Sequence, residues 1–334
     1  MQRPIFASVQ DYGRTFTNPD YWRPYVEEIC ARHGFHPCRA VRTGVPGTLP
    51  VFIVDERYVV KLFSDLFHGD VGFRVEREVY DLLANRDDIP APALLASGAL
   101  FSEEDGCSWP YLVSQLLPGR SLRESAEQVG VADMLAVARY LAPILRRLHH
   151  VRPEPSAHLR PTWDAFDHFL TDQRATVVAQ HQRWQALPDR LIEQIEDYLL
   201  PLAALVDHQT PPHLMHCDLN ADHVLGSFSG EQWLPTGIID FGDARVGDRN
   251  YELVALHIGL FHGEKRFLRA FLDAYGCTAE LRRDFARRAM SMTLLHEFNV
   301  LGEVMQRFPT AVDVGSLAEL AVLLWDLEQP GLHG

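Results

Sequence analysis

The sequence predicts an α+β fold of two lobes, a small β-rich lobe followed by a large and mainly helical lobe. Two observations predict it. The β-rich runs concentrate before residue 115, whereas nearly all apolar runs beyond Gly119 have helical spacing. The length of 334 residues also suits about two such units. We therefore expect an N-terminal lobe over 1–114, a hinge over 115–118 and a C-terminal lobe over 119–334, with a cleft between the lobes.

Two helices are expected in the N-terminal lobe. The stretch TNPDYWRPYVEEICARHG contains Asn18, which suits an N-cap, and Pro19, which suits the first turn. Gly34 suits the end of this helix. The stretch GFRVEREVYDLLA, residues 72–84, has apolar residues near helical spacing and predicts an amphipathic helix.

The strands of this lobe follow from two β-rich stretches. PVFIVDERYVVKLF, residues 50–63, has two β-rich runs around the polar turn 55–57, which predicts a hairpin. PYLVSQLLPG, residues 110–119, is an apolar run that ends at a Pro-Gly break. We expect it to be the strand that leads out of the lobe.

The C-terminal lobe is expected to be helical around one inserted hairpin. Four segments predict helices: MLAVARYLAPILRRLHH (134–150), LPDRLIEQIEDYLLPLAALV (187–206), DFARRAMSMTLLHEFNVLGEVM (284–305) and SLAELAVLLWDLE (316–328). The exception is a pair of short strands, 223–225 and 236–241, which are separated by a Gly-containing turn.

Charge and cysteine content narrow the class of function. Aspartate and glutamate number 45 against 31 lysines and arginines, a net charge of −14. This excess argues against nucleic acid as a partner and suits a cationic small molecule, although solubility explains it equally well. The five cysteines are widely spaced and include no C-x-x-C, which predicts reduced thiols and a cytoplasmic location. We expect no signal peptide and no membrane span, and a monomer is the default expectation.

Four charged residues occur in an order that suits phosphoryl transfer. Lys61 lies in the apolar strand YVVKLF, and Glu78 follows on the next helix. Asp218 lies in the polar stretch HCDLNADHVLG, and Asp240 ends the strand GIID. Phosphoryl transfer needs a lysine that holds nucleotide phosphates, a glutamate that holds the lysine, a carboxylate for the substrate hydroxyl and a carboxylate for the metal ions. Each residue alone is weak evidence, but the ordered set predicts a kinase.

A zinc site is the alternative interpretation of the polar stretch. His213, His216, Cys217 and His223 are all suitable zinc ligands. Their spacing matches no familiar zinc finger, and a zinc site leaves the other charged residues unexplained. The phosphoryl-transfer interpretation is therefore favoured.

The sequence resembles the aminoglycoside phosphotransferases of the protein-kinase-like superfamily, whose catalytic loop reads H-G-D-x-x-x-x-N before an I-D strand end. The resemblance covers nearly the whole chain. Outside the kinase core it is closest to the hygromycin B phosphotransferases that act on the 7''-hydroxyl, in the stretches NPDYWRPYVEE, VVKLF, DQRATVVAQHQRW, GDRNYELVALH and LLHEFNV. It implies a bilobal protein-kinase-like fold and a kinase for a cationic aminoglycoside, first of all hygromycin B.

The resemblance also implies roles for the four charged residues. Lys61 would contact the nucleotide phosphates and Glu78 would orient it. Asp218 would be the catalytic base, and Asp240 a metal ligand. The implied cofactors are ATP, with GTP as the alternative, and Mg²⁺.

Further contacts to the nucleotide are implied by position. Gln115 and Leu117 would hydrogen-bond the nucleobase through their backbone as the hinge. The loop 43–48, which ends at Thr48, would cover the phosphates. His216 would brace the catalytic loop, and Asp248 would cap the helix that follows.

The sequence departs from the family pattern at two positions. Cys217 replaces the usual glycine, and His223 replaces the asparagine that is the second metal ligand. The loop DLNADHVL is more similar to that of the 2''-aminoglycoside kinases, which also carry histidine there. We expect His223 to lie at the metal and Mn²⁺ to be tolerated, because imidazole nitrogen suits softer ions than Mg²⁺. The alternative is that His223 only packs beside the loop.

The acceptor side is expected to hold polar and acidic residues. Candidates are Asn220, Asp222, Asp243, His296 and Glu297, although His296 and Glu297 are equally explained as core or surface residues. Only seven residues separate Asp240 from Asp248, which leaves no room for the activation loop of a protein kinase and favours a small-molecule acceptor. Two rival hypotheses remain: a metabolic kinase for a sugar, amino alcohol or other natural product, and a pseudokinase that binds nucleotide without transfer.

Overall fold

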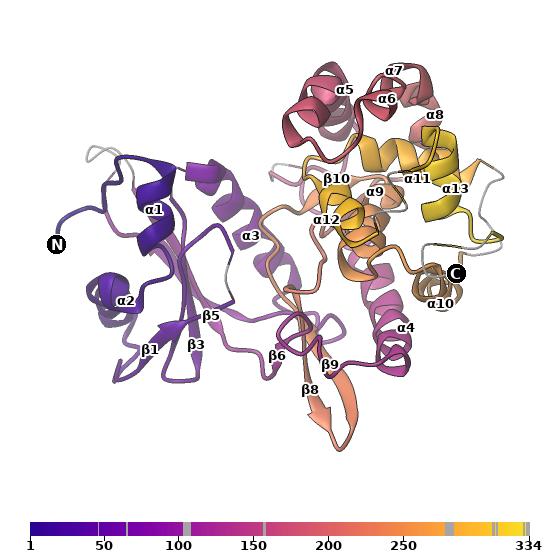
Figure 1. The fold of residues 1–334 in the computed structure, drawn as a ribbon. Helices are drawn as coiled ribbons and strands as arrows, with labels where there is room; N and C mark the ends of the chain where they lie inside the picture. Colours follow the sequence, from indigo (N-terminus) through magenta and orange to yellow (C-terminus); the bar gives the residue numbers. More distant parts are fainter. Residues whose placement is uncertain are drawn as a thin grey trace.

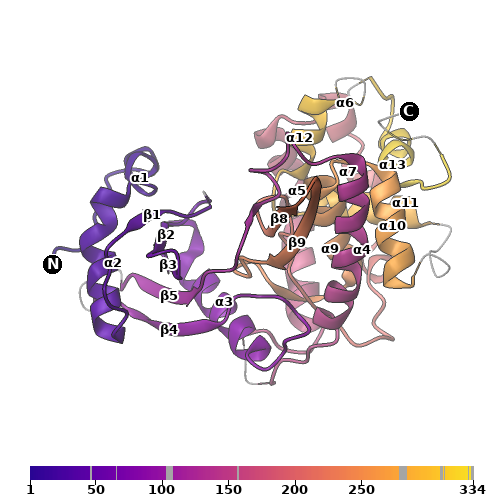
Figure 2. The same cartoon turned by 90° about the horizontal axis from the view of Figure 1, so that it is seen from below.

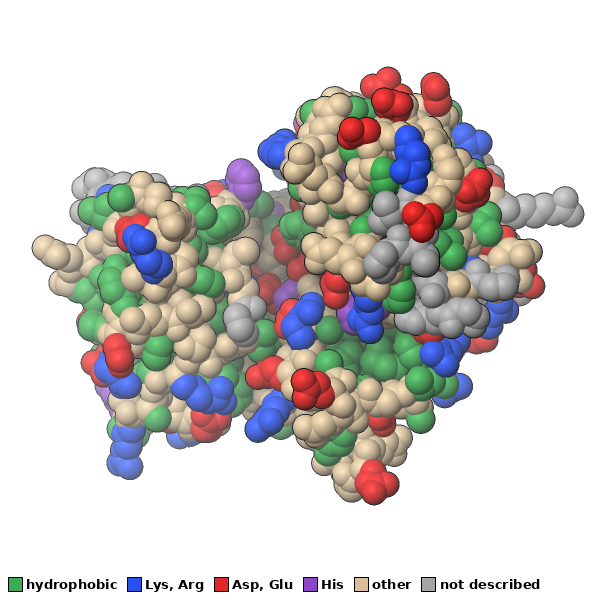
Figure 3. Space-filling model, viewed as in Figure 1, with side chains coloured by type: hydrophobic (Ala, Val, Ile, Leu, Met, Phe, Trp, Pro, Cys, Tyr) green, Lys and Arg blue, Asp and Glu red, His purple; other side chains and the backbone are tan. Residues whose placement is uncertain are grey.

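The computed structural model describes residues 1–45, 47–64, 66–102, 108–155, 158–277, 284–308, 311, 313–329 and 331. The chain folds into two lobes, one built on a sheet and one mainly helical, as Figures 1 and 2 show from two directions. The space-filling view is hollowed between the lobes, and acidic and histidine side chains lie in the hollow (Figure 3).

The N-terminal lobe is organised around a five-stranded antiparallel sheet. Its strands are β1 (Val41–Thr43), β2 (Val51–Val54), β3 (Tyr58–Leu62), β4 (Leu94–Ala99) and β5 (Pro110–Gln115), in the order β1-β2-β3-β5-β4. The expected hairpin is β2–β3, in which Val51 pairs with Lys61. Lys61 also pairs with Leu112 of β5, so the lysine lies in the centre of the sheet rather than at its edge.

Helices cover both faces of this sheet. They are α1 (Val9–Thr15), α2 (Pro19–His33), the short 3₁₀ turn η1 (Leu66–His68) and α3 (Gly69–Leu83). As expected, Asn18 caps α2 by accepting from the N–H groups of Asp20 and Tyr21, and Gly34 ends it in the left-handed conformation at φ 71°. The amphipathic helix begins at Gly69, three residues before the expected start.

Two clusters of buried apolar residues stabilise the lobes. One packs α1 and α2 on one face of the sheet and contains Trp22, Phe52 and Trp109. The other contains Val79 of α3 and Leu112 of β5 together with the buried apolar residues of the helical lobe. Because α3 belongs to this second cluster, it is fixed against the boundary between the lobes.

The helices of the C-terminal lobe are α4 (Val131–Leu148), α5 (Asp164–Trp184), α6 (Asp189–Ile192), α7 (Ile195–Tyr198), α8 (Leu202–Leu205), α9 (Arg249–Val254), the π-helical turn η3 (Ala255–Leu260), α10 (Lys265–Tyr275), α11 (Phe285–Leu294), α12 (Val300–Arg307) and α13 (Leu317–Trp325). Two expected long helices are broken. Residues 187–206 form α6, α7 and α8, because Pro201 has no N–H to continue the ladder and Leu199 turns to an extended ψ of 131°. Residues 284–305 form α11 and α12, and Asn299 caps α12 by accepting from Gly302 N–H.

Short strands in this lobe frame the polar stretch. β6 (Arg120–Ser121), β8 (Val224–Ser229) and β9 (Gln232–Ile238) form one sheet, and β7 (His213–Met215) pairs with β10 (Arg245–Gly247). The expected hairpin is β8–β9, longer than the sequence suggested. The polar stretch runs between β7 and β8, and Asp240 follows β9, so both reach the same end of the lobe.

No helix in the described part of the chain is long and apolar enough to cross a bilayer.

Candidate active site

Lys61 is the centre of a buried ion-pair network. Its Nζ donates to Glu76 Oε2 at 2.7 Å and to Asp240 Oδ1 at 2.6 Å. Burial favours the neutral amine, but the carboxylates of Asp240 and Glu76 raise the pKa of Lys61 above its usual value. Asp240 is carried by the C-terminal lobe, so the lysine joins residues from both lobes.

The glutamate that holds Lys61 is Glu76, and the prediction of Glu78 in that role is wrong. Glu76 lies on the buried face of α3, where Tyr80 also donates to it at 3.0 Å. Glu78 is two positions on, about 200° around the helix. It points instead to the backbone N–H groups of His158 and Leu159, at 2.8 and 3.2 Å.

A signal for Glu76 was present in the sequence. Val79, Tyr80 and Leu83 follow it at i+3, i+4 and i+7, so Glu76 is the acid on the apolar face of the helix. A buried acid needs a partner, whereas an acid on the polar face does not.

Asp218 lies in a loop that the side chain of His216 braces. His216 Nε2 donates to the Ile239 carbonyl at 2.9 Å, and its Nδ1 accepts from Asp218 N–H at 3.3 Å. The His216 N–H donates to the buried carboxylate of Glu252 at 2.6 Å. Between them Cys217 adopts φ 68°, the left-handed region that favours glycine, which explains why glycine is usual at this position.

The side chain of Asp218 is held by Asn220, whose Nδ2 donates to Asp218 Oδ1 at 3.1 Å. Burial raises the pKa of Asp218 above its usual value. A carboxylate of raised pKa is a better proton acceptor than an exposed one. Asn220, expected on the acceptor side, therefore lies in contact with Asp218.

His223 lies between the two aspartates. Its Nδ1 is 2.6 Å from the Asp218 carbonyl, which leaves Nε2 directed at Asp240, with Nε2–Oδ2 at 3.6 Å. Burial favours neutral imidazole, but Asp240 and Asp218 raise the pKa of His223 above its usual value. Among the described residues no three His, Cys, Asp or Glu side chains are arranged as a metal cage, so the zinc alternative finds no support in this part of the chain.

Asp240 keeps its negative charge in this site. Burial alone would raise its pKa, but Lys61 and His223 hold the pKa of Asp240 well below its usual value. The backbone of Asp240 is in the left-handed region at φ 67°. Strain of this kind recurs at functional sites and is maintained by the surrounding structure.

The residues expected as hinge leave β5 in extended form. Gln115 N–H donates to the Ala93 carbonyl and Leu116 N–H to the Arg57 carbonyl, both at 2.9 Å. Neither bond uses the Gln115 carbonyl or the Leu117 N–H. Thr48 is exposed and its carbonyl accepts from Tyr12 Oη at 2.6 Å. Pro46 of the same loop lies outside the described residues.

The expected acceptor residues have different surroundings. Asp222 is paired with Arg123 at 2.6 Å, and Glu297 with Arg245 at 2.7 Å, so both charges are compensated. The third acidic candidate is Asp243. Burial and the nearby Asp218 raise the pKa of Asp243 to about 7.

His296 was a candidate for the acceptor side, with a core position as the alternative, and the structure places it in the core. It is 0% exposed, and its ring stacks on Tyr251 with centroids 4.7 Å apart. Burial lowers the pKa of His296 to about 4, so the ring is neutral. Arg245 was missed from the sequence because only its pairing with Glu297, 52 positions away, places it at the site.

A model of the phosphotransferase enzyme family matches residues 47–290, which span the network from Lys61 to Asp240 and extend beyond it on both sides. Among curated proteins, the lysine-specific demethylase JMJ21 of Arabidopsis thaliana is 22% identical over 93% of this chain and 45% of its own length. The chain thus spans about half the length of that relative.

Solved structures share the fold. The GDP complex of aminoglycoside 2'-phosphotransferase-IIIa has a TM-score of 0.65 at 21% identity, covering 90% of this chain and 96% of the other. The complex of APH(4)-Ia with AMP-PNP and hygromycin B has a TM-score of 0.53 at 20% identity, covering 81% and 87%. These similarities show the bilobal α+β kinase-like fold. With the family model matching well over half of its residues, the chain belongs to the phosphotransferase enzyme family.

Proposed function

We propose that this chain is a small-molecule kinase that transfers the γ-phosphate of a nucleoside triphosphate to a hydroxyl of a cationic aminoglycoside. One observation carries the proposal: Lys61 bonds Glu76 within its own lobe and Asp240 across the lobe boundary, with Asp218 in the adjoining loop. This is the arrangement that phosphoryl transfer requires. Residues 1–114 would be the nucleotide lobe, 115–118 the hinge through Gln115 and Leu117, and 119–334 the acceptor lobe.

Lys61 would hold nucleotide phosphates, because its charge is maintained in a buried place and Glu76 keeps it in position. Asp218 would orient the acceptor hydroxyl and accept its proton, an assignment supported by its burial and its bond from Asn220. Thr48 would lie over the phosphates. Most of the rate enhancement would come from positioning and charge rather than from covalent chemistry.

The side chains present fit a divalent cation. The Asp240 carboxylate stays charged, and the Nε2 of His223 is directed at it from 3.6 Å. An oxygen and a nitrogen donor, completed by phosphate oxygens and water, suit Mg²⁺ and still better Mn²⁺. The ion would neutralise charge on the phosphates.

Hygromycin B is the first acceptor to test, since flanking sequence resembles its phosphotransferases and Asp243 adds a carboxyl group beside Asp218. One observation favours the second candidate, a metabolic kinase for a sugar or amino alcohol. Asp222 and Glu297 are neutralised by arginines, which leaves fewer free acids for a polycation. The intact Lys61–Glu76 pair argues against a pseudokinase.

The test is a purified reaction with ATP or GTP, Mg²⁺ or Mn²⁺, and hygromycin B, other aminoglycosides or amino alcohols, read by mass spectrometry for a phosphate adduct. Asp218→Asn is the matched control, because it keeps the shape of the side chain and removes the base. An adduct on amino alcohols alone would select the second candidate. Nucleotide binding without any adduct across the panel would overturn the proposed transfer.

A further inference from the structure

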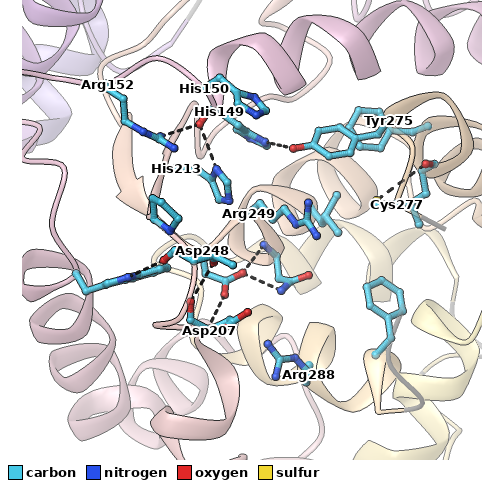
Figure 4. A pocket seen from close by; sticks show the side chains of 18 residues that line it. His149, His150, Arg152, Asp207, His213, Asp248, Arg249, Tyr275, Cys277 and Arg288 are labelled. Carbon is cyan, nitrogen blue, oxygen red and sulfur yellow. Dashed lines mark hydrogen bonds between the residues drawn. The ribbon is translucent and has the colours of Figure 1, made fainter. Parts of the chain in front are cut away.

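A cavity of about 570 Å³ lies in the helical lobe, and none of Lys61, Asp218 and Asp240 lines it. Its walls come from the end of α4, from residues 207–213, from the start of α9, from the end of α10 with Cys277, and from the start of α11 (Figure 4). Cavities of this size commonly hold small molecules. The cavity is therefore a candidate ligand site apart from the active site.

The cavity wall carries more arginines than acids, although the chain as a whole has a net charge of −14. Three arginines, Arg152, Arg249 and Arg288, line it together with two acids, Asp207 and Asp248. In Figure 4 Arg152 lies at the upper left, Arg249 near the middle and Arg288 towards the bottom.

Two of the arginines bond only uncharged acceptors among the groups that the structure describes. Arg152 Nη1 donates to the carbonyls of His149 and Pro212 at 3.1 and 3.0 Å. Arg288, 6% exposed, donates to the Leu205 carbonyl at 2.7 Å and to that of Ala204. Their positive charges therefore persist in the wall.

The two acids are occupied within the fold. Asp248 caps α9, where its Oδ1 accepts from the N–H and the Nδ2 of Asn250 at 2.8 and 2.7 Å. Asp207 Oδ1 accepts from Gln209 N–H at 3.1 Å. Three of the four carboxylate oxygens therefore already accept from donors of the fold, whereas Arg152 and Arg288 have no carboxylate partner among the described residues, and this difference favours an anionic ligand.

Much of the rest of the wall is apolar or aromatic, beside the polar side chains of Thr210, His213 and Asn250. Leu253, Phe271, Leu272 and Tyr275 contribute from α9 and α10, and Trp163 from the residue before α5. Guanidinium groups beside such a surface suit a charged oxygen on an apolar body. We propose that this cavity binds a small organic anion, a carboxylate, sulfonate or phosphate ester with an aromatic or aliphatic body.

The cavity is connected to the catalytic loop by buried polar contacts. His149 lines the cavity, with Nδ1 2.7 Å from Tyr275 Oη and Nε2 3.7 Å from Glu252 Oε2. The same Glu252 oxygen accepts from His216 N–H, and His216 braces Asp218. A ligand that displaces Tyr275 or His149 would therefore change the position of the catalytic loop through Glu252 and His216. This coupling rests on the proposed function, whereas the binding step does not.

The binding test uses 8-anilinonaphthalene-1-sulfonate, an aromatic sulfonate that fluoresces on transfer to an apolar site. We expect saturable one-site binding to the full chain, unaffected by saturating nucleotide. N-phenyl-1-naphthylamine has the same rings without the sulfonate and should bind about tenfold more weakly or worse, about 1.4 kcal/mol. Equal affinity for the two probes, no saturable binding, or displacement of the sulfonate by nucleotide would each overturn the proposal.

Variants locate the probe. Leu253→Trp adds volume in the cavity, and Arg152→Gln removes a charge without adding volume; each should weaken the sulfonate about tenfold. Leu234→Trp makes the same chemical change on the exposed β8–β9 hairpin and should leave binding unchanged. If Leu253→Trp lowers the melting temperature, Arg152→Gln decides. Wild-type affinity in Arg152→Gln would refute an anion site here.

Discussion

Substituting Glu76 and Glu78 separately tests the ion-pair network with a matched pair of changes on one helix. Lys61 and Glu76 are 2.7 Å apart, with side chains 11% and 3% exposed. Leaving one member of a buried pair without its partner costs about 3–5 kcal/mol. Asp240 still holds Lys61 at 2.6 Å, so we expect the lower end, about 3 kcal/mol, for Glu76→Gln.

Glu78→Gln should cost less. Glu78 accepts from two backbone N–H groups, of His158 and Leu159, and the neutral amide oxygen of glutamine still accepts from them. The loss is then the difference between charged and neutral acceptors, about 1 kcal/mol.

A double-mutant cycle with Lys61→Met separates the two glutamates further. We expect a coupling of about 2 kcal/mol between Lys61 and Glu76, and less than about 0.5 kcal/mol between Lys61 and Glu78. The assay is urea unfolding of the single and double variants, which needs no knowledge of the acceptor. Once an acceptor is found, the rate of transfer should follow the same pattern. Coupling to Glu78 equal to or larger than that to Glu76 would refute the assignment of the pair.

Three further predictions concern single side chains. Asp218→Ala should lower the rate of transfer by about 10²–10⁴-fold. Nucleotide affinity should stay largely intact, because Asp218 does not contact the lysine that would hold the phosphates. A rate above roughly a tenth of wild type would exclude Asp218 as the base. His223→Asn should keep activity, and it should lower the ratio of the Mn²⁺-supported rate to the Mg²⁺-supported rate, since an amide oxygen replaces an imidazole nitrogen. An unchanged ratio would mean that His223 only packs beside the loop. Burial lowers the pKa of His257 to about 4, and its Nε2 bonds the Leu324 carbonyl at 2.8 Å. The unfolded chain therefore binds the proton more readily below pH ~6.5, so the free energy of unfolding should fall by about 2 kcal/mol for this group between pH 7 and pH 5. His257→Gln should show a smaller loss by urea unfolding at the two pH values, and identical losses would contradict a buried neutral His257.

Features that depend on near neighbours in the chain could be predicted from the sequence. The cap and end of α2 follow from Asn18 and Gly34, because each acts within one turn of its own position. The β2–β3 hairpin follows from two β-rich runs around a short turn. The order of Lys61, Asp218 and Asp240 indicated phosphoryl transfer, and the family resemblance added the role of each residue. The ion pair of Lys61 with Asp240 and the position of His223 between the two aspartates agree with these expectations.

Contacts between distant segments could be decided only by the tertiary structure. Spacing marks Glu76 as the acid on the apolar face of α3, but only the packing of that face decides that its partner is Lys61 of β3. Asp222 looked free for a ligand until the fold brought Arg123, 99 positions earlier, within 2.6 Å. His296 was a polar residue in an apolar run, and its burial on Tyr251 depends on how α9 and the segment after α11 pack. The physical reason is common to all three: a side chain's partner lies on a surface that it meets only after the chain has folded, and local spacing does not identify that partner.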